Sequence, residues 1–389
     1  MVPPAVCLHR FALALCALCY ALLLLGGHVH NTGSSLACGT DWPRCHGVWM
    51  PVMKGGVLLE HSHRILAGLV GLGAVVLAIW LALDDRRRGA RSALGMALSV
   101  VGFVVAQLAG LMVFASLGPR HGEAAPGDVP VLAFGLGVVG LLTFGGSVAV
   151  AFLRRQPRLG WGLLAVGLVV AQGLLGALTV AVGLSPAIST AHLGTSMLFF
   201  AVLLVLAVRT RPARGAGDGG GGATPIPARL RTLVAVALGG VYLQMLLGAV
   251  VRHLGAGMIC GREFPLCMGT VWPGEAHPGV YLHILHRALG VALLLGSFYL
   301  AAVVRAGSAD PAVRRAALAF PALMVLQVAL GILAVYTVLN AHTVTTHLGV
   351  AAAALADLVW LLGATRGVDA AREPAVASGH GAALKTGAA

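Results

Sequence analysis

Four histidines lie inside long apolar stretches of the sequence, where an unpartnered polar side chain is costly. Each lies about five to seven residues from one end of its stretch, roughly 8 to 10 Å deep if the stretch is a helix. The four are His63, His192, His286 and His347. Two imidazoles at matching depth on two helices form the arrangement that binds a heme iron at both axial positions.

Each histidine taken alone has a simpler explanation, because a single intramembrane histidine more often makes a helix contact or relays protons than binds a metal. Four histidines at equivalent positions of two similar segments, however, favour the interpretation that they bind a metal. A zinc or copper site fits less well, since each set offers two such ligands rather than three or four. The sequence contains no Cys-x-x-Cys-His motif, so covalent heme attachment by that route is excluded.

Glu60 precedes His63 by three residues, so the two side chains share one face of a helix. The corresponding residue of a second, similar segment is His283. The two segments therefore differ where a reaction needs a base or an anion, which predicts one reacting site and one electron-handling site. The alternative is that Glu60 forms only a structural salt bridge with Arg64, four residues later.

Two arginines, Arg64 and Arg287, each follow a candidate ligand directly. A guanidinium near the membrane surface can bind a heme propionate through its planar fork. The alternative is that both side chains extend to the lipid headgroups.

Two cysteine pairs, Cys38 with Cys45 and Cys260 with Cys267, lie in connections between apolar stretches. Six residues separate the members of each pair, and this spacing permits a disulfide on an oxidising side of a membrane. Structural staples and redox-active pairs both fit the sequence.

The elements that carry these residues are predicted to be membrane-spanning helices. Of the 389 residues, 58% are hydrophobic and only 10% are charged, a balance that a water-soluble core of this size does not hide. Ten apolar stretches are long enough to cross the roughly 30 Å hydrocarbon layer as helices. They are residues 9–30, 57–83, 92–117, 130–153, 160–183, 187–208, 229–252, 279–304, 313–337 and 342–364.

The predicted fold class is thus an all-α integral membrane protein with about ten transmembrane helices. Barrel strands would alternate over about ten residues, whereas these stretches are continuously apolar. The first stretch lacks a convincing cleavage site and is expected to stay as a helix.

Basic residues predict the orientation, because cytoplasmic loops are rich in arginine and lysine. Alternate connections contain fifteen arginines, and the intervening ones contain only Arg44, Lys54, Arg120, Arg252 and Arg262. We therefore expect a multi-pass protein of the cell's inner (plasma) membrane with both termini in the cytoplasm. The net charge of +13 is mostly this topology signal, and no nucleic-acid partner is expected.

The motifs occur twice in the same order, which predicts two pseudo-symmetric four-helix bundles. We expect residues 1–208 to form the first half, with an additional helical hairpin at 92–153. A Gly-rich cytoplasmic linker at 209–228 leads to the second half at 229–366 and a cytoplasmic tail at 367–389.

With these motifs the chain resembles the heme A synthase family. The matching elements are the first cysteine loop, Glu60-x-x-His63-Arg64, His192, the second cysteine loop, His286-Arg287 and His347. The resemblance covers the eight helices of the repeat. The sequence departs from the family at His30, where an arginine is common, and in the helices from 92 to 153.

The resemblance implies a heme b cofactor between His286 and His347 and a substrate heme between His63 and His192. It implies that the C8 methyl group of heme O is oxidised to the formyl group of heme A, with Glu60 as the catalytic residue. Implied partners are heme O, an unidentified electron acceptor, heme O synthase and terminal oxidase assembly factors. The main alternative is a membrane b-type cytochrome that only transfers electrons, and a transporter with duplicated halves is a third interpretation.

Overall fold

The computed structural model describes residues 4–87, 95, 98, 100–103, 144–212, 227–274 and 276–366. Most of the predicted helix at 92–117, most of that at 130–153, most of the linker at 209–228 and the whole tail at 367–389 lie outside these residues. Of the additional hairpin, one short apolar helix, Phe144–Leu153, is described.

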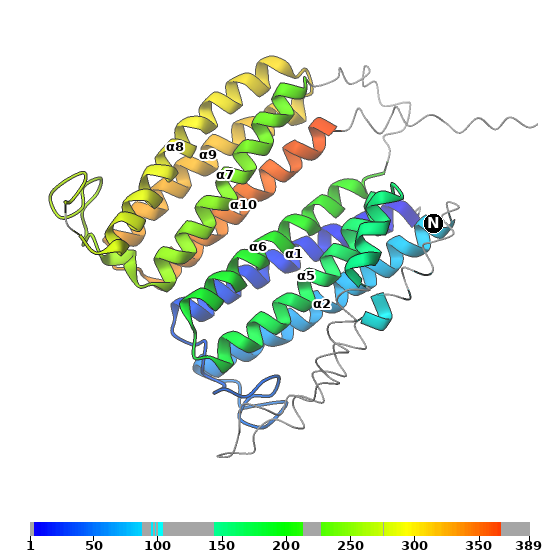
Figure 1. Ribbon diagram of the computed structural model, residues 1–389, viewed down its shortest axis with the longest axis horizontal. Helices are drawn as coiled ribbons and strands as arrows, with labels where there is room; N and C mark the ends of the chain where they lie inside the picture. Colours follow the sequence, from blue (N-terminus) through cyan, green and yellow to red (C-terminus); the bar gives the residue numbers. More distant parts are fainter. Residues whose placement is uncertain are drawn as a thin grey trace, which may run out of the picture.

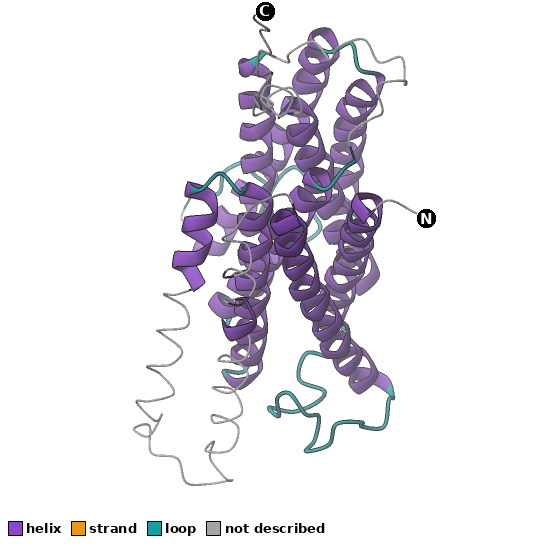
Figure 2. Ribbon diagram, turned by 90° about the vertical axis from the view of Figure 1, so that its right-hand side faces the viewer, coloured by secondary structure: helices purple, strands orange, loops and turns teal. Residues whose placement is uncertain are grey.

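Eight helices in the described part of the chain are long and apolar enough to cross a membrane. This confirms the predicted all-α membrane fold, and Figure 2 shows the helices running along one common direction. The described residues contain no strand, since the only ladder pairs are two isolated bridges in the cysteine loops. Helices suit a lipid environment because every backbone group is satisfied within its own segment. The helices are α1 (Pro4–Asn31), α2 (Gly55–Arg87), α5 (Pro157–Ala181), α6 (Pro186–Arg209), α7 (Ala228–His253), α8 (Pro278–Gly307), α9 (Pro311–Tyr336) and α10 (Ala341–Arg366).

Proline and an acidic cap mark where several of these helices begin. Pro157, Pro186, Pro278 and Pro311 occupy first-turn positions, where a missing amide hydrogen costs nothing. At the start of α9 the Asp310 side chain also accepts a hydrogen bond of 2.8 Å from the amide of Ala312. Local features of the sequence thus mark the starts of these four helices without reference to packing between helices.

The helices form two bundles of four (Figure 1). In the first half, α1 contacts α2, α2 contacts α5, α5 contacts α6, and α6 returns to α1. In the second half, α7, α8, α9 and α10 close a ring by contacts in the same order. The cysteine loops lie at one end of the bundles, and the chain's N-terminus lies at the other (Figure 1).

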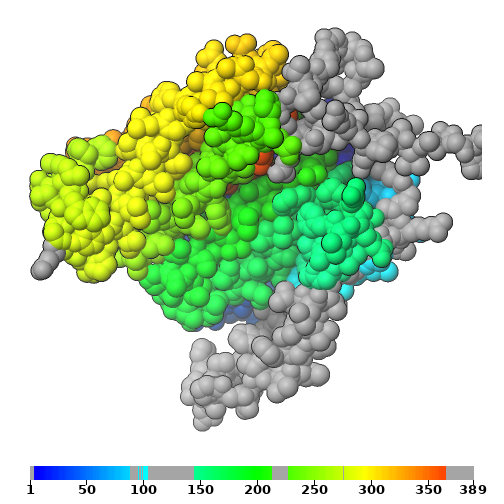
Figure 3. Space-filling model, turned by 45° about the horizontal axis from the view of Figure 1, so that its top comes forward, coloured from blue at the N-terminus to red at the C-terminus, as the bar shows by residue number. Residues whose placement is uncertain are grey.

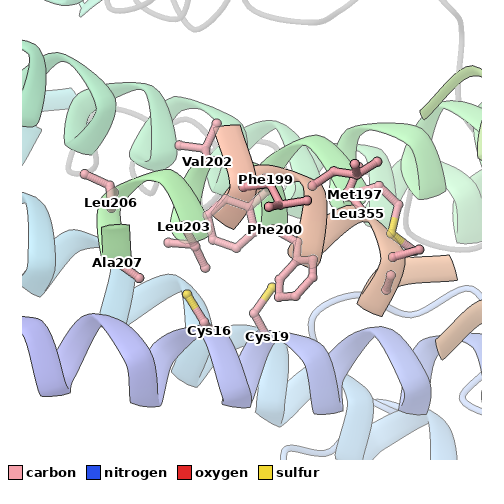
Figure 4. Packing of buried hydrophobic residues seen from close by; sticks show 14 of the residues in the cluster. Cys16, Cys19, Met197, Phe199, Phe200, Val202, Leu203, Leu206, Ala207 and Leu355 are labelled. Atoms are coloured by element: carbon pink, nitrogen blue, oxygen red, sulfur yellow. The ribbon is translucent and has the colours of Figure 1, made fainter. Parts of the chain in front are cut away.

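The two bundles share a continuous apolar core, formed where α1 and α6 meet α7 and α10. Figure 3 shows the two halves packed directly against each other over their length. Cys16 and Cys19 point from α1 toward Phe200 and Leu203 of α6, and both thiols are buried (Figure 4). Large apolar side chains remain exposed on the outer surfaces, for example Leu295 at 65% and Val236 at 67%. An outer surface of this kind suits lipid as the surrounding solvent.

Candidate functional site

The four predicted ligand histidines are carried by equivalent helices of the two halves, α2 and α6 in the first and α8 and α10 in the second. Within each half the two imidazoles lie close enough to interact electrostatically, His63 with His192 and His347 with His286. Nδ1 of each ring is buried and has no hydrogen-bond partner among the described residues. The described part of the chain thus supplies no hydrogen-bond partner for this nitrogen in any of the four rings.

Each of these rings packs against a glycine of a neighbouring helix. A Cβ atom built on Gly26 of α1 would lie 2.7 Å from Cε1 of His63, and one on Gly248 of α7 would lie 2.8 Å from Cε1 of His286. Real Cβ atoms essentially never approach this closely, so these glycines create the space that the rings occupy.

The second histidine of each half has the same environment. The corresponding distances are 3.4 Å from Gly176 to His192 and 3.2 Å from Gly331 to His347. All four histidines therefore pack against a glycine of an adjacent helix, here called a glycine notch. The contact is tight at His63, His286 and His347 and is an ordinary van der Waals contact at His192. Because glycine has no side chain, each ring can lie close to the backbone of the neighbouring helix, and space between the helices is left open.

Glutamines contact three of the four histidines. Gln172 donates to the carbonyl oxygen of His192 over 3.1 Å, and Gln244 donates to that of His286 over 2.8 Å. The amide nitrogen of Gln327 lies 3.1 Å from Nε2 of His347. Two of these contacts hold the backbone at a histidine, and the third engages a ring nitrogen of His347 directly.

One large cavity of about 950 Å³ reaches all four histidines. Its volume lies at the upper end of the range for small-molecule sites. The lining is predominantly apolar, with Glu60, Arg64 and Arg252 as its charged members. A cavity of this kind, with paired imidazoles in it, fits flat apolar macrocycles that carry a metal and a few acidic groups.

Glu60 lies on the cavity wall in the first half and is only 3% exposed. Its Oε1 lies 2.5 Å from Nη2 of Arg64, and its Oε2 accepts a hydrogen bond of 2.7 Å from the backbone amide of Cys38. The salt bridge to Arg64 that the sequence offered as an alternative is thus present. It fixes the carboxylate one helical turn from His63, and the catalytic role of Glu60 stays a prediction.

The two arginines predicted to bind propionates both reach back to the cysteine loops. Arg64 donates to the carbonyl oxygens of Asp41 and Arg44 over 2.6 and 2.7 Å, besides its pairing with Glu60. Arg287 donates to the carbonyl oxygen of Leu266 over 2.9 Å, while its Nη2 is buried and has no partner among the described residues. Arg287 therefore keeps one donor unpaired among the described residues, and its role in propionate binding stays a prediction.

Both cysteine pairs are disulfides, Cys38 with Cys45 and Cys260 with Cys267, which confirms the predicted bridges. All four residues are buried, with Cys38, Cys45 and Cys267 fully enclosed. Buried sulfurs are shielded from exchange with external thiols, so the structure favours the staple over the redox-active pair.

Several cavity and helix residues were missed by the sequence reasoning. Asp357 is a further carboxylate in a histidine-bearing helix, and its Oδ2 is buried without a partner among the described residues. His61 is 4% exposed and lies against the first disulfide. Asp357 could have been recognised from hydropathy alone, because it is a charged residue inside an apolar stretch. The contact of His61 with the disulfide could not, because it depends on how the loop folds over α2.

The chain also matches a family of known proteins. The model of a family described as cytochrome oxidase assembly protein, COX15-CtaA, matches residues 131–359, more than half of the chain. The chain belongs to this family. The match includes three of the four histidines and the whole second cysteine loop.

Relatives of this COX15-CtaA member align over most of their length. A protein of Symbiobacterium thermophilum named heme A synthase is 29% identical over 88% of this chain and 90% of its own. Proteins of the same name from an Exiguobacterium species and from Alkalihalophilus pseudofirmus are 27% and 28% identical, over 73% and 70% of this chain and 69% and 68% of their own. The similarity therefore extends over both halves.

Proposed function

We propose that this protein is a heme A synthase, which oxidises the C8 methyl group of heme O to the formyl group of heme A. Its relatives of that name align with up to 88% of the chain. The observation that carries the proposal is a single difference between two otherwise similar halves. Both halves bury an imidazole pair in glycine notches, and only the first places a carboxylate at the position of Glu60.

The first half would take the substrate, with His63 and His192 as the two ligands of its iron. The second half would bind heme b between His286 and His347, with the free donor of Arg287 available for a propionate. When bound, heme b supplies a carrier that accepts and passes single electrons. Apolar cavity walls exclude water from both sites except where polar groups admit it.

The reaction proceeds through two oxidations of the same carbon. In the first, the methyl group gives up two electrons and one proton, and a water molecule gives up a second proton and adds to the carbon as hydroxide, which yields a hydroxymethyl group. In the second, the hydroxymethyl group gives up two electrons and two protons and becomes the formyl group. The four electrons released in the two oxidations pass to an external acceptor.

Glu60 would act on the carbon and the water rather than on the iron. Arg64 and the Cys38 amide hold its two oxygens, and each oxygen keeps a lone pair for a further contact. A fixed anion in an apolar site stabilises the positive charge that develops on the carbon and accepts the proton of the attacking water. The corresponding His283 cannot supply this anion.

The membrane placement follows from the arginine distribution. We infer that both termini and the 209–228 linker lie in the cytoplasm and that the cysteine loops face outward in the plasma membrane. The position of Glu60 and the resemblance to heme A synthases support residues 1–208 as the substrate half and residues 229–366 as the heme b half.

The direct test is to supply heme O and an electron acceptor to the purified protein and to identify the extracted hemes by chromatography. Heme A formed in step with loss of heme O is the expected result. Heme b alone, with heme O unchanged, would identify an electron-transfer cytochrome. A protein without bound heme would contradict both and favour a transporter.

A further inference from the structure

The first helix of the first half contacts the second half next to one of its histidines. Tyr20 of α1 donates a hydrogen bond of 3.1 Å to the carbonyl oxygen of Gly349 in α10. A Cβ atom built on Gly349 would lie 2.7 Å from Cδ2 of Leu24, which is on the same face of α1 as Tyr20. Gly349 follows His347 by two residues, so α1 holds the backbone beside that histidine.

The same contact occurs with the halves exchanged. Tyr242 of α7 donates a hydrogen bond of 3.1 Å to the carbonyl oxygen of Gly194 in α6. A Cβ atom built on Gly194 would lie 2.5 Å from Cδ2 of Leu246. Gly194 follows His192 by two residues, so α7 holds the backbone beside a histidine of the first half.

Each of these two helices also contacts a histidine of its own half through the glycine notches. Gly26 of α1 packs on His63, and Gly248 of α7 packs on His286. Helix α1 therefore joins His63 to the backbone beside His347, and α7 joins His286 to the backbone beside His192. The four histidines are thus linked pairwise across the two halves by single helices.

We propose that Tyr20 and Tyr242 are positioning residues, each of which sets the geometry of the histidine pair in the opposite half. The inference rests on the proposed function, in which the pairs bind hemes. Packed helices transmit small displacements because their interiors have little free volume. A shift of His63 when the substrate binds therefore reaches the ligand pair of the cofactor through α1.

The test uses spectroscopy of the purified full chain with its bound heme and added heme O. Tyr20→Phe removes one hydroxyl and its hydrogen bond to Gly349. It should shift the EPR g values and the midpoint potential of the second-half heme and leave the first-half signal in place. Tyr242→Phe should do the reverse. Signals are assigned to the halves by their loss in His286→Ala and His63→Ala.

A matched control and a rescue separate positioning from a general loss of stability. Tyr299→Phe removes the hydroxyl of a tyrosine that is 55% exposed on α8, and it should leave both signals unchanged. Gly349→Ala introduces a Cβ atom against Leu24 and should also shift the second-half signal. Adding Leu24→Ala removes the closest obstructing group and leaves the Tyr20 hydroxyl 3.1 Å from the new Cβ atom, so the double variant should recover part of the parental spectrum.

The outcomes distinguish this inference from the function beneath it. If His286→Ala abolished a heme signal while Tyr20→Phe and Gly349→Ala left the second-half spectrum unchanged, the coupling would be wrong and the proposed function would stand. If Tyr20→Phe changed only the first-half signal, the crossed assignment would be wrong. If neither histidine variant altered bound heme, the proposed function and this inference would fail together.

Discussion

The backbone amide of Cys38 donates a hydrogen bond of 2.7 Å to Oε2 of Glu60, so the first cysteine loop is fastened to the carboxylate beside the histidine pair. Arg64 reinforces this attachment, because the same guanidinium contacts Glu60 and two carbonyl groups of the loop. The loop, the carboxylate and the second helix form one unit on the cavity wall.

Replacing Glu60 with Gln should lower conversion of heme O by about a hundredfold to a thousandfold. The change removes the anion and nearly preserves the shape, and a preorganised group at a developing charge contributes about 3 to 4 kcal/mol. Bound heme b should remain at the parental level. Chromatography of hemes from cells with equal protein levels measures the effect.

Glu263→Gln provides the matched control, since Glu263 accepts a backbone hydrogen bond of 2.8 Å from Gly269 in an exposed loop of the other half. It should leave conversion unchanged. Heme A production at the parental rate in Glu60→Gln would reduce Glu60 to a structural partner of Arg64.

Replacing His286 or His347 with Ala should remove the resident heme b spectrum. Each change deletes one of two axial nitrogens, and six-coordinate binding requires both. Absorption spectra and heme content of the purified variants measure this loss. Parental heme content in both variants would contradict the cofactor assignment.

The glycine notches predict an effect that depends on position within one helix. Gly248→Ala places a Cβ atom 2.8 Å from His286 and should displace the ring and lower heme b occupancy severalfold. Gly239→Ala in the same helix meets nothing within 4 Å and should leave occupancy unchanged. Equal occupancy in the two variants, measured as heme per protein, would show that the notch does not constrain the ligand.

The two disulfides should differ in their importance for turnover. Replacing Cys38 and Cys45 with Ser loosens the loop that donates to Glu60, so conversion of heme O should fall more than tenfold. The corresponding change at Cys260 and Cys267 disturbs a loop without this carboxylate and should lower conversion less. Turnover per bound heme is the measurement, and a greater loss from the second pair would contradict the assignment of the halves.

Hydropathy and motif order were sufficient to predict the helical membrane fold and both disulfides. These features depend on the length of apolar runs and on spacing, which are local properties of the sequence. The predicted spans at 92–117 and 130–153 are not tested, because they lie mostly outside the described residues.

The contacts of the site residues could not be predicted in this way. The notches at Gly26 and Gly248 depend on which helix faces which, and glycine is common throughout the sequence. Likewise, the spacing of Glu60 and Arg64 indicated their salt bridge, but the hydrogen bond from Cys38 requires the loop to fold back over α2. Asp357 was overlooked although its charge in an apolar run was visible.

The contacts of Tyr20 and Tyr242, each with a glycine carbonyl of the opposite half, resemble those of an isologous interface. In such an interface both partners use the same surface. Symmetric homodimers are built in this way. Here both partners belong to one chain, so the two halves can differ, as they do at Glu60 and His283, while the tyrosine contacts that hold them together stay the same.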